Sequence, residues 1–242
     1  MWVRRVNTFR GMENFRSLLG MPSAAKYETT WEGIAKAVRD HVTVANRALV
    51  FGQIASLLLS TCALRNADWH AENVALNYIM RRDVQSAPAH DMLATAAYPD
   101  YAKNPPGIAF MGRKTRDRGK SLQTFITVAL DLPAPEQAAI ADQGETTMAE
   151  VDPQVHAAMV EHPVSAEIGK RKLLTWQEDI TGLREERTYS LGGSHCVKRS
   201  QGSRIQRGSD AARCCRSFGT AGEALIRFVW FAENDMRHAS GA

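Results

Sequence analysis

The sequence predicts an α+β domain, mostly α-helical, over residues 1–190, followed by a basic tail over residues 191–242. Several segments repeat apolar residues at the three-to-four-residue spacing of amphipathic helices. Two short apolar segments, residues 74–80 and 84–89, flank a charged turn and predict a β-hairpin. With 44% hydrophobic and 23% charged residues over 242 positions, the chain is long and apolar enough to bury a core.

The first eleven residues are basic and irregular, and a helix is expected over residues 12–19, where apolar side chains share one face. Thr29 and Glu32 have the spacing of a capping box, which pairs an N-cap hydroxyl with a glutamate three residues later. We therefore expect a second helix from this box to about Val42.

The strongest apolar run covers residues 48–64. A membrane span usually needs about 20 apolar residues. This run is interrupted by Gln53, Ser56 and Thr61, and the charged Arg65 follows at once. We therefore predict a buried helix rather than a membrane span, and no membrane partner.

The remaining elements follow from periodicity and from breaking residues. A short helix or loop is expected over residues 92–97 and a short strand over residues 108–111. Three further helices are expected over residues 121–130, 136–151 and 166–187, and Pro153 is expected to begin another between the last two.

Residues 192–219 contain six Lys or Arg residues among Ser, Gly and Gln, with Asp210 as the only acid. Such a segment can bind nucleic acid by neutralising phosphates, but it lacks the interleaved aromatic residues of a stacking platform. Direct nucleic-acid binding is therefore only weakly suggested, and a solvated tail is expected. The apolar segment 224–232 is expected to dock as a short helix.

The four cysteines show neither zinc-ligand spacing nor a disulfide framework, because Cys214 and Cys215 are adjacent and Cys62 lies inside the apolar run. No apolar segment follows Arg4 and Arg5, so a signal peptide is not expected. These features favour a cytoplasmic protein in a reducing compartment.

The polar loop over residues 66–73 carries the candidate chemistry. Asp68 and Asn73 have the Asp-x-x-x-x-Asn spacing of kinase catalytic loops, in which a carboxylate orients the attacking hydroxyl and an amide oxygen binds a metal. The hairpin that follows can return Asp91 to the side of Asn73, where it would bind the same metal. On spacing alone, the favoured interpretation is that Asp68 and Asn73 are ordinary turn residues.

The flanking sequence favours the kinase interpretation. Residues 12–28, with Lys26-Tyr27-Glu28 at their end, resemble the start of the C-terminal domain of HipA-like kinases. Residues 66–73 are similar to that family's Asn-Gly-Asp-x-His-x-Lys-Asn, and residues 87–95 to its Ala-Pro-x-Tyr-Asp-x-x-Ser-Thr. The last helix, with Gly169-Lys170-Arg171 and Trp176, also resembles the family. The resemblance covers about Arg5 to Tyr189.

The resemblance implies a protein-kinase-like C-lobe and serine/threonine protein kinase activity with Mg²⁺ and ATP. Asp68 matches the catalytic base, and Asn73 and Asp91 match the magnesium ligands. His70, Asn73 and Asp91 are the implied cofactor-binding residues, and we expect His70 to brace the loop by hydrogen bonds. The family also implies a protein substrate and a DNA-binding antitoxin, because HipA-like proteins are toxins of bacterial toxin–antitoxin modules.

The sequence departs from the family at Ala67, Glu72 and His90, where the family has Gly, Lys and Tyr. No glycine-rich phosphate loop or strand lysine precedes Met12, so the C-lobe is expected without an N-lobe. Two function classes stay open. One is a kinase lobe completed by a separate N-lobe chain, and the other is an inactive fragment that binds an antitoxin or substrate protein.

Overall fold

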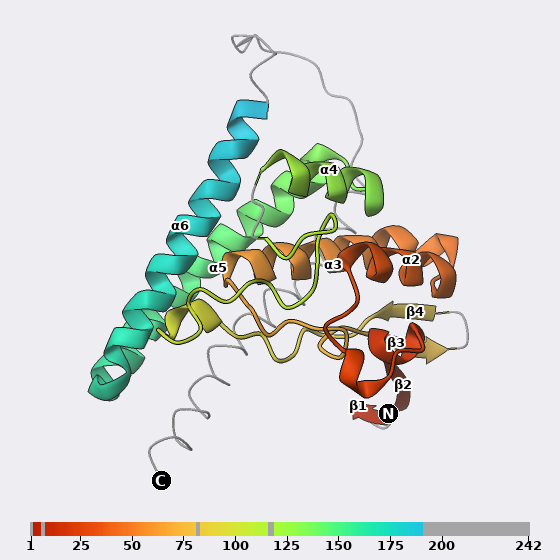
Figure 1. Cartoon of the computed structure of the whole chain (residues 1–242), viewed down its shortest axis with the longest axis horizontal. Coiled ribbons are helices and arrows are strands. Elements are labelled where there is room, and N and C mark those ends of the chain that lie inside the picture. Colours follow the sequence, from red (N-terminus) through yellow and green to blue (C-terminus); the bar gives the residue numbers. More distant parts are fainter. Residues whose placement is uncertain (1, 6–7, 81–82, 116–118, 191–242) are drawn as a thin grey trace.

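A computed structural model describes residues 2–5, 8–80, 83–115 and 119–190. Most of these residues are helical, and one small antiparallel sheet lies at an end of the helical body (Figure 1). The α+β prediction is therefore confirmed. The predicted tail and its apolar segment lie outside the described residues, and the division at residue 190 stays a prediction.

The sheet has four antiparallel strands in the order β1 (Trp2–Arg5), β2 (Thr8–Asn14), β3 (Ala75–Met80) and β4 (Asp83–Ser86). The predicted hairpin is the pair β3–β4, in which Leu76 lies opposite Ser86. The second strand of this hairpin ends three residues earlier than residues 84–89 predicted. Residues 87–91 therefore lie outside the sheet and lead back to the loop over residues 66–73, where Asp91 contacts Asn73.

The prediction for residues 1–19 is wrong. Residues expected to be irregular or helical form β1 and β2, and the helix shrinks to α1 (Phe15–Leu18). The reason is tertiary, since β2 pairs with β3 from Gly11 opposite Tyr78 to Asn14 opposite Ala75. Pairing with a distant strand outweighs local helical spacing. Asn14 then caps α1, accepting a 2.9 Å hydrogen bond from the Ser17 amide.

Helix α2 (Trp31–His41) begins one residue later than the predicted capping box requires. Its N-cap is Thr30, whose hydroxyl accepts a 3.0 Å hydrogen bond from the Gly33 amide. Glu32 does not complete a box, because its carboxylate accepts a 2.8 Å hydrogen bond from the Met111 amide, 79 positions away. The predicted helix is confirmed, but the Thr29–Glu32 box is wrong.

Helix α3 (Val44–Ala63) starts four residues before the predicted apolar run. It is long and apolar enough to cross a membrane by length and composition. Half of its apolar window is buried inside the protein, with Ile54 and Ala55 fully enclosed. The helix contacts α2 and β4, and also two helices that follow later in the chain, α5 (Ala134–Glu161) and α6 (Ala166–Ser190). These contacts support the prediction of a core helix.

The C-terminal helices are α4 (Lys120–Ala129), α5 (Ala134–Glu161) and α6 (Ala166–Ser190), with short 3₁₀ turns η1 (Ser23–Ala25), η2 (Thr95–Ala97) and η3 (Pro163–Ser165). Pro153 lies inside α5 and does not begin a new helix. A proline inside a helix costs about 3 kcal/mol, and the burial of Val151 and Val155 on either side offsets that cost.

The strand predicted over residues 108–111 is also wrong. Ala109 forms only an isolated bridge with Thr30, and Phe110 forms another with Arg113. Ile108 and Phe110 are nevertheless buried, so the apolar residues of this segment pack into the core without a ladder. In Figure 1, α5 and α6 lie side by side, while α2 and α3 run between them and the sheet.

Candidate functional site

The loop over residues 66–73 joins α3 to β3 and is fixed by backbone hydrogen bonds from the N-terminal segment. The Phe15 amide donates to the Val74 carbonyl at 3.0 Å, and the Arg16 amide donates to the Ala71 carbonyl at 3.1 Å. The Ala71 amide donates in turn to the Lys26 carbonyl at 3.1 Å. The segment that opens the domain therefore positions the loop.

Thr95 fixes the other end of this loop. Its hydroxyl accepts a 2.8 Å hydrogen bond from the Ala67 amide and donates a 2.8 Å hydrogen bond to the Arg65 carbonyl. Arg65 has a positive φ of 48°, a conformation that non-glycine residues rarely adopt. One side chain thus ties the segment after the hairpin to the strained turn that begins the loop.

Trp69 anchors the middle of the loop in the core. It is 1% exposed, and its ring stacks on that of Trp31 with centroids 6.0 Å apart and planes 8° apart. Gly107 packs against the same point, where an added Cβ would lie 2.1 Å from the Trp69 carbonyl oxygen. Trp69 is therefore enclosed in the core, whereas the neighbouring Asp68 stays partly exposed.

The structure brings Asn73 and Asp91 together, as the hairpin predicted. The Asn73 amide donates a 3.1 Å hydrogen bond to the Asp91 carboxylate and lies 3.4 Å from the Asp91 carbonyl oxygen. Asn73 is 2% exposed, whereas Asp91 is exposed to solvent. Asp91 has a positive φ of 55°, so the backbone is held in a strained conformation at this residue.

Asp68 and His70 complete the cluster. Ligand atoms of Asp68, His70 and Asp91 all lie within 4.8 Å of one another. The Asn73 amide nitrogen faces Asp91, which leaves its amide oxygen as a further donor. Two carboxylates and an amide oxygen form the hard oxygen donor set that Mg²⁺ prefers, so the residues fit this ion.

Tyr27 makes a contact that was not predicted from the sequence. Its hydroxyl donates a short hydrogen bond to the Asp68 carboxylate across 41 positions. Burial, followed by the hydrogen bond and negative charge of Asp68, raises the pKa of Tyr27 to about 12. The motif Lys26-Tyr27-Glu28 was the available signal, but it indicated family resemblance without assigning a role to Tyr27.

His70 is buried and braces the loop, in agreement with the expectation for this residue. Its Nε2 lies 3.0 Å from Lys26 Nζ, and its Nδ1 lies 3.3 Å from the Glu72 amide nitrogen. A neutral imidazole has one acceptor nitrogen, so these two donors compete for it. The contact with the charged Lys26 ammonium is the shorter one, which favours Nε2 as the acceptor nitrogen. Burial and then the Lys26 charge lower the pKa of His70.

Two of the three departures from the family pattern have partners in the structure. Glu72 Oε1 lies 2.6 Å from Arg16 Nε, an ion pair without hydrogen-bond alignment. His90 Nε2 lies 3.2 Å from the Glu72 carbonyl oxygen, which links the segment before Asp91 to the loop. Both substituted side chains therefore hold the loop in place.

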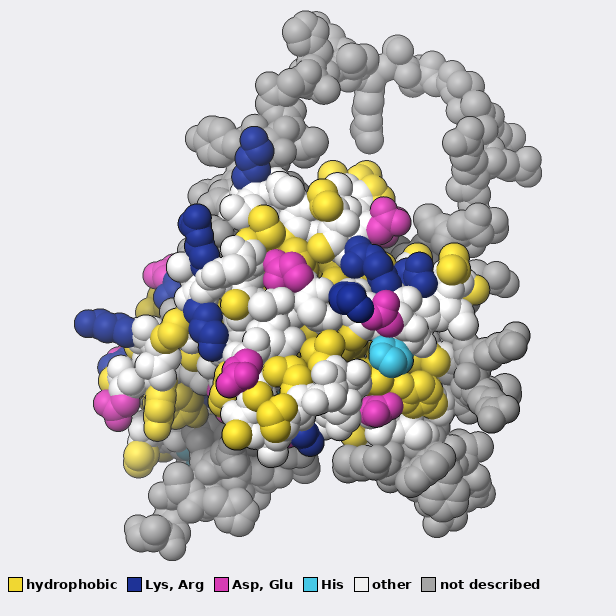
Figure 2. All heavy atoms as spheres, turned by 45° about the vertical axis from the view of Figure 1, so that its right-hand side comes forward, with side chains coloured by type: hydrophobic (Ala, Val, Ile, Leu, Met, Phe, Trp, Pro, Cys, Tyr) yellow, Lys and Arg dark blue, Asp and Glu magenta, His cyan; other side chains and the backbone are white. Residues whose placement is uncertain are grey.

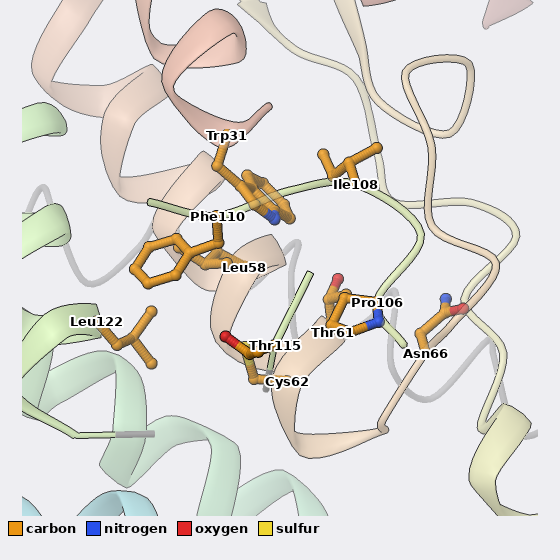
Figure 3. Close-up of a pocket in the computed structure, with 10 residues that line it drawn as sticks. All are labelled: Trp31, Leu58, Thr61, Cys62, Asn66, Pro106, Ile108, Phe110, Thr115 and Leu122. Carbon is orange, nitrogen blue, oxygen red and sulfur yellow. The ribbon is translucent and has the colours of Figure 1, made fainter. Parts of the chain in front are cut away.

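Figure 3 shows a cavity that Asn66 and residues of α3 help to line; Asp68 and Asp91 are not among its lining residues. It measures about 30 Å³ and is mostly apolar, with Trp31, Leu58 and Phe110 among its lining residues. The buried Asn66 Nδ2 beside it has no hydrogen-bond partner among the described residues. The cavity has room for water but is far smaller than the roughly 300 Å³ of the smallest typical ligand pockets.

The charges on the surface are mixed. On the face in Figure 2, basic side chains lie next to acidic ones, with hydrophobic side chains between them. The described part of this face therefore offers no continuous basic patch for a nucleic-acid backbone. The predicted basic tail lies outside the described residues, so its weak suggestion of nucleic-acid binding stays a prediction.

The fold resembles that of HipA from Shewanella oneidensis MR-1, solved as a complex of HipA, HipB and operator DNA. The TM-score is 0.56 at 13% sequence identity, with 77% of this chain covered. This chain spans 49% of that HipA chain. No curated protein sequence matches.

A family model described as the HipA-like C-terminal domain matches residues 3–159. The matched range includes β2, the loop with Asp68 and Asn73, and the segment with Asp91. It ends within α5, so the likeness of residues 169–176 to the family stays a prediction. Because the model spans more than half of the sequence, the chain belongs to the family of HipA-like C-terminal domains.

Proposed function

We propose that this chain is the catalytic lobe of a cytoplasmic serine/threonine protein kinase of the HipA toxin type. In this proposal it has a protein-kinase-like C-lobe fold and transfers the γ-phosphoryl group of Mg-ATP to a protein hydroxyl. The observation that carries the proposal is the 3.1 Å contact between Asn73 and Asp91, with Asp68 at the same cluster. Turn residues without a shared role have no reason to converge from separate segments.

Each residue has a defined task in this proposal. Asp68 accepts a hydrogen bond from the acceptor hydroxyl, orients it toward the γ-phosphorus and takes its proton as the new P–O bond forms. Asn73 and Asp91 hold Mg²⁺, and His70 keeps the loop in shape. When bound, Mg²⁺ neutralises charge on the phosphate oxygens. The bond from the γ-phosphorus to the bridging oxygen breaks, and ADP leaves.

The partner in this proposal is a DNA-binding antitoxin. Support comes from the Shewanella HipA structure, which contains HipB and operator DNA. This chain covers only 49% of that HipA chain, so both the antitoxin and the kinase activity of the whole protein are proposals for this chain. The alternative is an inactive fragment that binds an antitoxin or a substrate protein. It predicts that Asp68→Asn has no measurable effect on nucleotide binding or ADP release, while binding of the partner protein survives.

The test separates nucleotide binding from chemistry. Mg-ATP is titrated calorimetrically into the full chain, and ADP release is measured with water as the acceptor. Asp68→Asn should keep nucleotide binding and reduce ADP release by about 100-fold or more, the usual contribution of a general base. Asp91→Asn and Asn73→Ala should weaken Mg-ATP binding, because each removes a metal ligand.

Asp100→Asn is the matched control, because Asp100 is an exposed aspartate near the same segment and outside the cluster. It should leave both binding and ADP release unchanged. Failure of the wild-type chain to bind Mg-ATP at millimolar concentration would overturn the proposal. Equal ADP release by wild type and Asp68→Asn would do the same.

A further inference from the structure

Two lysines lie over the ring of Tyr27, the residue whose hydroxyl reaches Asp68. Lys26 Nζ is 5.0 Å from the ring centroid, and Lys114 Nζ is 6.0 Å from it. Lys114 also donates a 3.3 Å hydrogen bond to the Tyr27 carbonyl oxygen. Two lysines that are far apart in the sequence thus place their ammonium groups around the residue that contacts the candidate base.

These two charges differ from the other cations around the loop. Arg16 pairs with Glu72 at 2.6 Å, and Arg65 pairs with the buried Asp179 at 2.8 Å. Within the part of the chain that the structure describes, neither Lys26 nor Lys114 has a carboxylate partner within 4.0 Å. Their positive charge is therefore available to an anion from outside the chain.

Lys26 is held in place without losing its capacity to donate. The Ala71 amide fixes its carbonyl oxygen at 3.1 Å, and its ammonium uses one hydrogen on His70 Nε2 at 3.0 Å. A lysine ammonium has three hydrogens, so two remain for a ligand.

The cluster needs such cations if it is to hold a phosphate chain. Asp68 and Asp91 would repel phosphate oxygens, and the loop position where the family has lysine is Glu72, already paired with Arg16. We propose that Lys26 and Lys114 form an anion subsite that binds the terminal phosphates of a magnesium-bound nucleoside triphosphate. The inference rests on the proposed function for its ligand, and it assigns phosphate neutralisation to residues outside the catalytic loop.

Magnesium tripolyphosphate is the probe, because it carries the phosphate chain without the base or sugar. It is titrated calorimetrically into the full chain at low and high salt. Lys26→Met and Lys114→Met should each weaken binding about tenfold, the usual loss for one charge-assisted hydrogen bond. Lys26→Arg should retain most of the affinity. Lys36→Met is the matched control, since Lys36 is an exposed lysine on α2 paired with Asp40.

Circular dichroism establishes that each variant is folded. Lys114 is exposed, so Lys114→Met keeps the test valid if Lys26→Met disturbs the loop. Unchanged binding in Lys114→Met and the folded Lys26 variants would overturn the subsite, as would a wild-type chain that does not bind the probe. Lysine-dependent binding without any effect of Asp68→Asn on ADP release would instead overturn the kinase proposal and leave the subsite standing.

Discussion

The Tyr27 hydroxyl donates a hydrogen bond to the carboxylate of Asp68, the residue that the sequence motif assigns as the catalytic base. The contact joins the turn after η1 to the loop after α3, 41 positions later in the chain. A hydroxyl already occupies one oxygen of Asp68. An acceptor hydroxyl must therefore use the other oxygen or displace Tyr27.

The contact with Asp68 predicts that Tyr27 loses its proton at a higher pH than an ordinary tyrosine. Burial and the nearby Asp68 raise the pKa of Tyr27 to about 12 from an ordinary value of 10.0. In Asp68→Asn the negative charge is gone, so the pKa of Tyr27 should fall toward 10.0 while the contribution of burial remains. Phenolate absorbance, recorded over the pH range in which circular dichroism is constant, measures the shift.

Tyr27→Phe identifies the transition, because burial and Glu13 raise the pKa of Tyr78 as well. The high-pH titration step that is lost in Tyr27→Phe must be the same step that shifts to lower pH in Asp68→Asn. Tyr101→Phe removes an exposed tyrosine and should leave the high-pH step in place. Identical high-pH titration in wild type and Asp68→Asn would contradict the hydrogen bond.

Gly107 is predicted to be essential for the shape of the loop. A Cβ at this position would lie 2.1 Å from the Trp69 carbonyl oxygen and 2.9 Å from the Ala67 carbonyl oxygen. Both neighbours are backbone atoms, so the loop itself must move. We expect Gly107→Ala to lower the free energy of unfolding by about 2–4 kcal/mol, the range of severe packing and strain effects.

Gly144→Ala is the matched control for this prediction. Gly144 lies within α5, and an added Cβ there has no neighbouring atom within 4 Å. Alanine favours the helix over glycine by about 1 kcal/mol. Urea unfolding should therefore show opposite signs for the two substitutions. A Gly107→Ala variant as stable as wild type would mean that the two carbonyl groups do not pack as described.

The helices and the hairpin were predictable because local periodicity and burial agree there. In α4 and α6 the apolar stripe is the buried face, so the pattern and the fold coincide. The errors came where distant residues decide the outcome. β2 is extended because β3 lies beside it, and α5 continues through Pro153 because the residues on either side of the proline are buried. Neither cause is visible in a short window of sequence.

The candidate site was also only partly predictable from the sequence. The spacing of Asp68 and Asn73, with the hairpin that returns Asp91, predicted the contact that the structure contains. Tyr27 and Thr95 were present in the recognised motifs, but their roles depend on pairings across 41 and 28 positions. A motif identifies which residues occur together, whereas the donor and acceptor of each contact require the fold.

Thr95 is predicted to stabilise the loop through its hydroxyl alone. Thr95→Val keeps the branched shape but removes the group that accepts from Ala67 and donates to Arg65. Two backbone partners lose a hydrogen bond, so the free energy of unfolding should fall by about 1–3 kcal/mol. Thr95→Ser retains the hydroxyl and should lose much less. Chemical denaturation compares the two, and equal losses would assign the role of Thr95 to its methyl group.

The lowered pKa of His70 predicts a loss of stability in acid. Above its ordinary pKa of 6.5, His70 is neutral in both the folded and the unfolded chain and contributes no pH dependence. As the pH falls below 6.5, the unfolded chain binds a proton that the folded chain resists, because the ring is buried beside Lys26. The free energy of unfolding should therefore fall with pH until the folded pKa is passed.

Two measurements check this behaviour of His70. The NMR titration of its ring should have a midpoint below 6.5, and Lys26→Met should raise that midpoint by removing the nearby positive charge. His70→Gln should reduce the difference in unfolding free energy between pH 7.5 and pH 5.5. A His70 midpoint at or above 6.5 would mean that Lys26 does not approach the ring. It would also mean that the positive charge of Lys26 does not act on His70 in the loop.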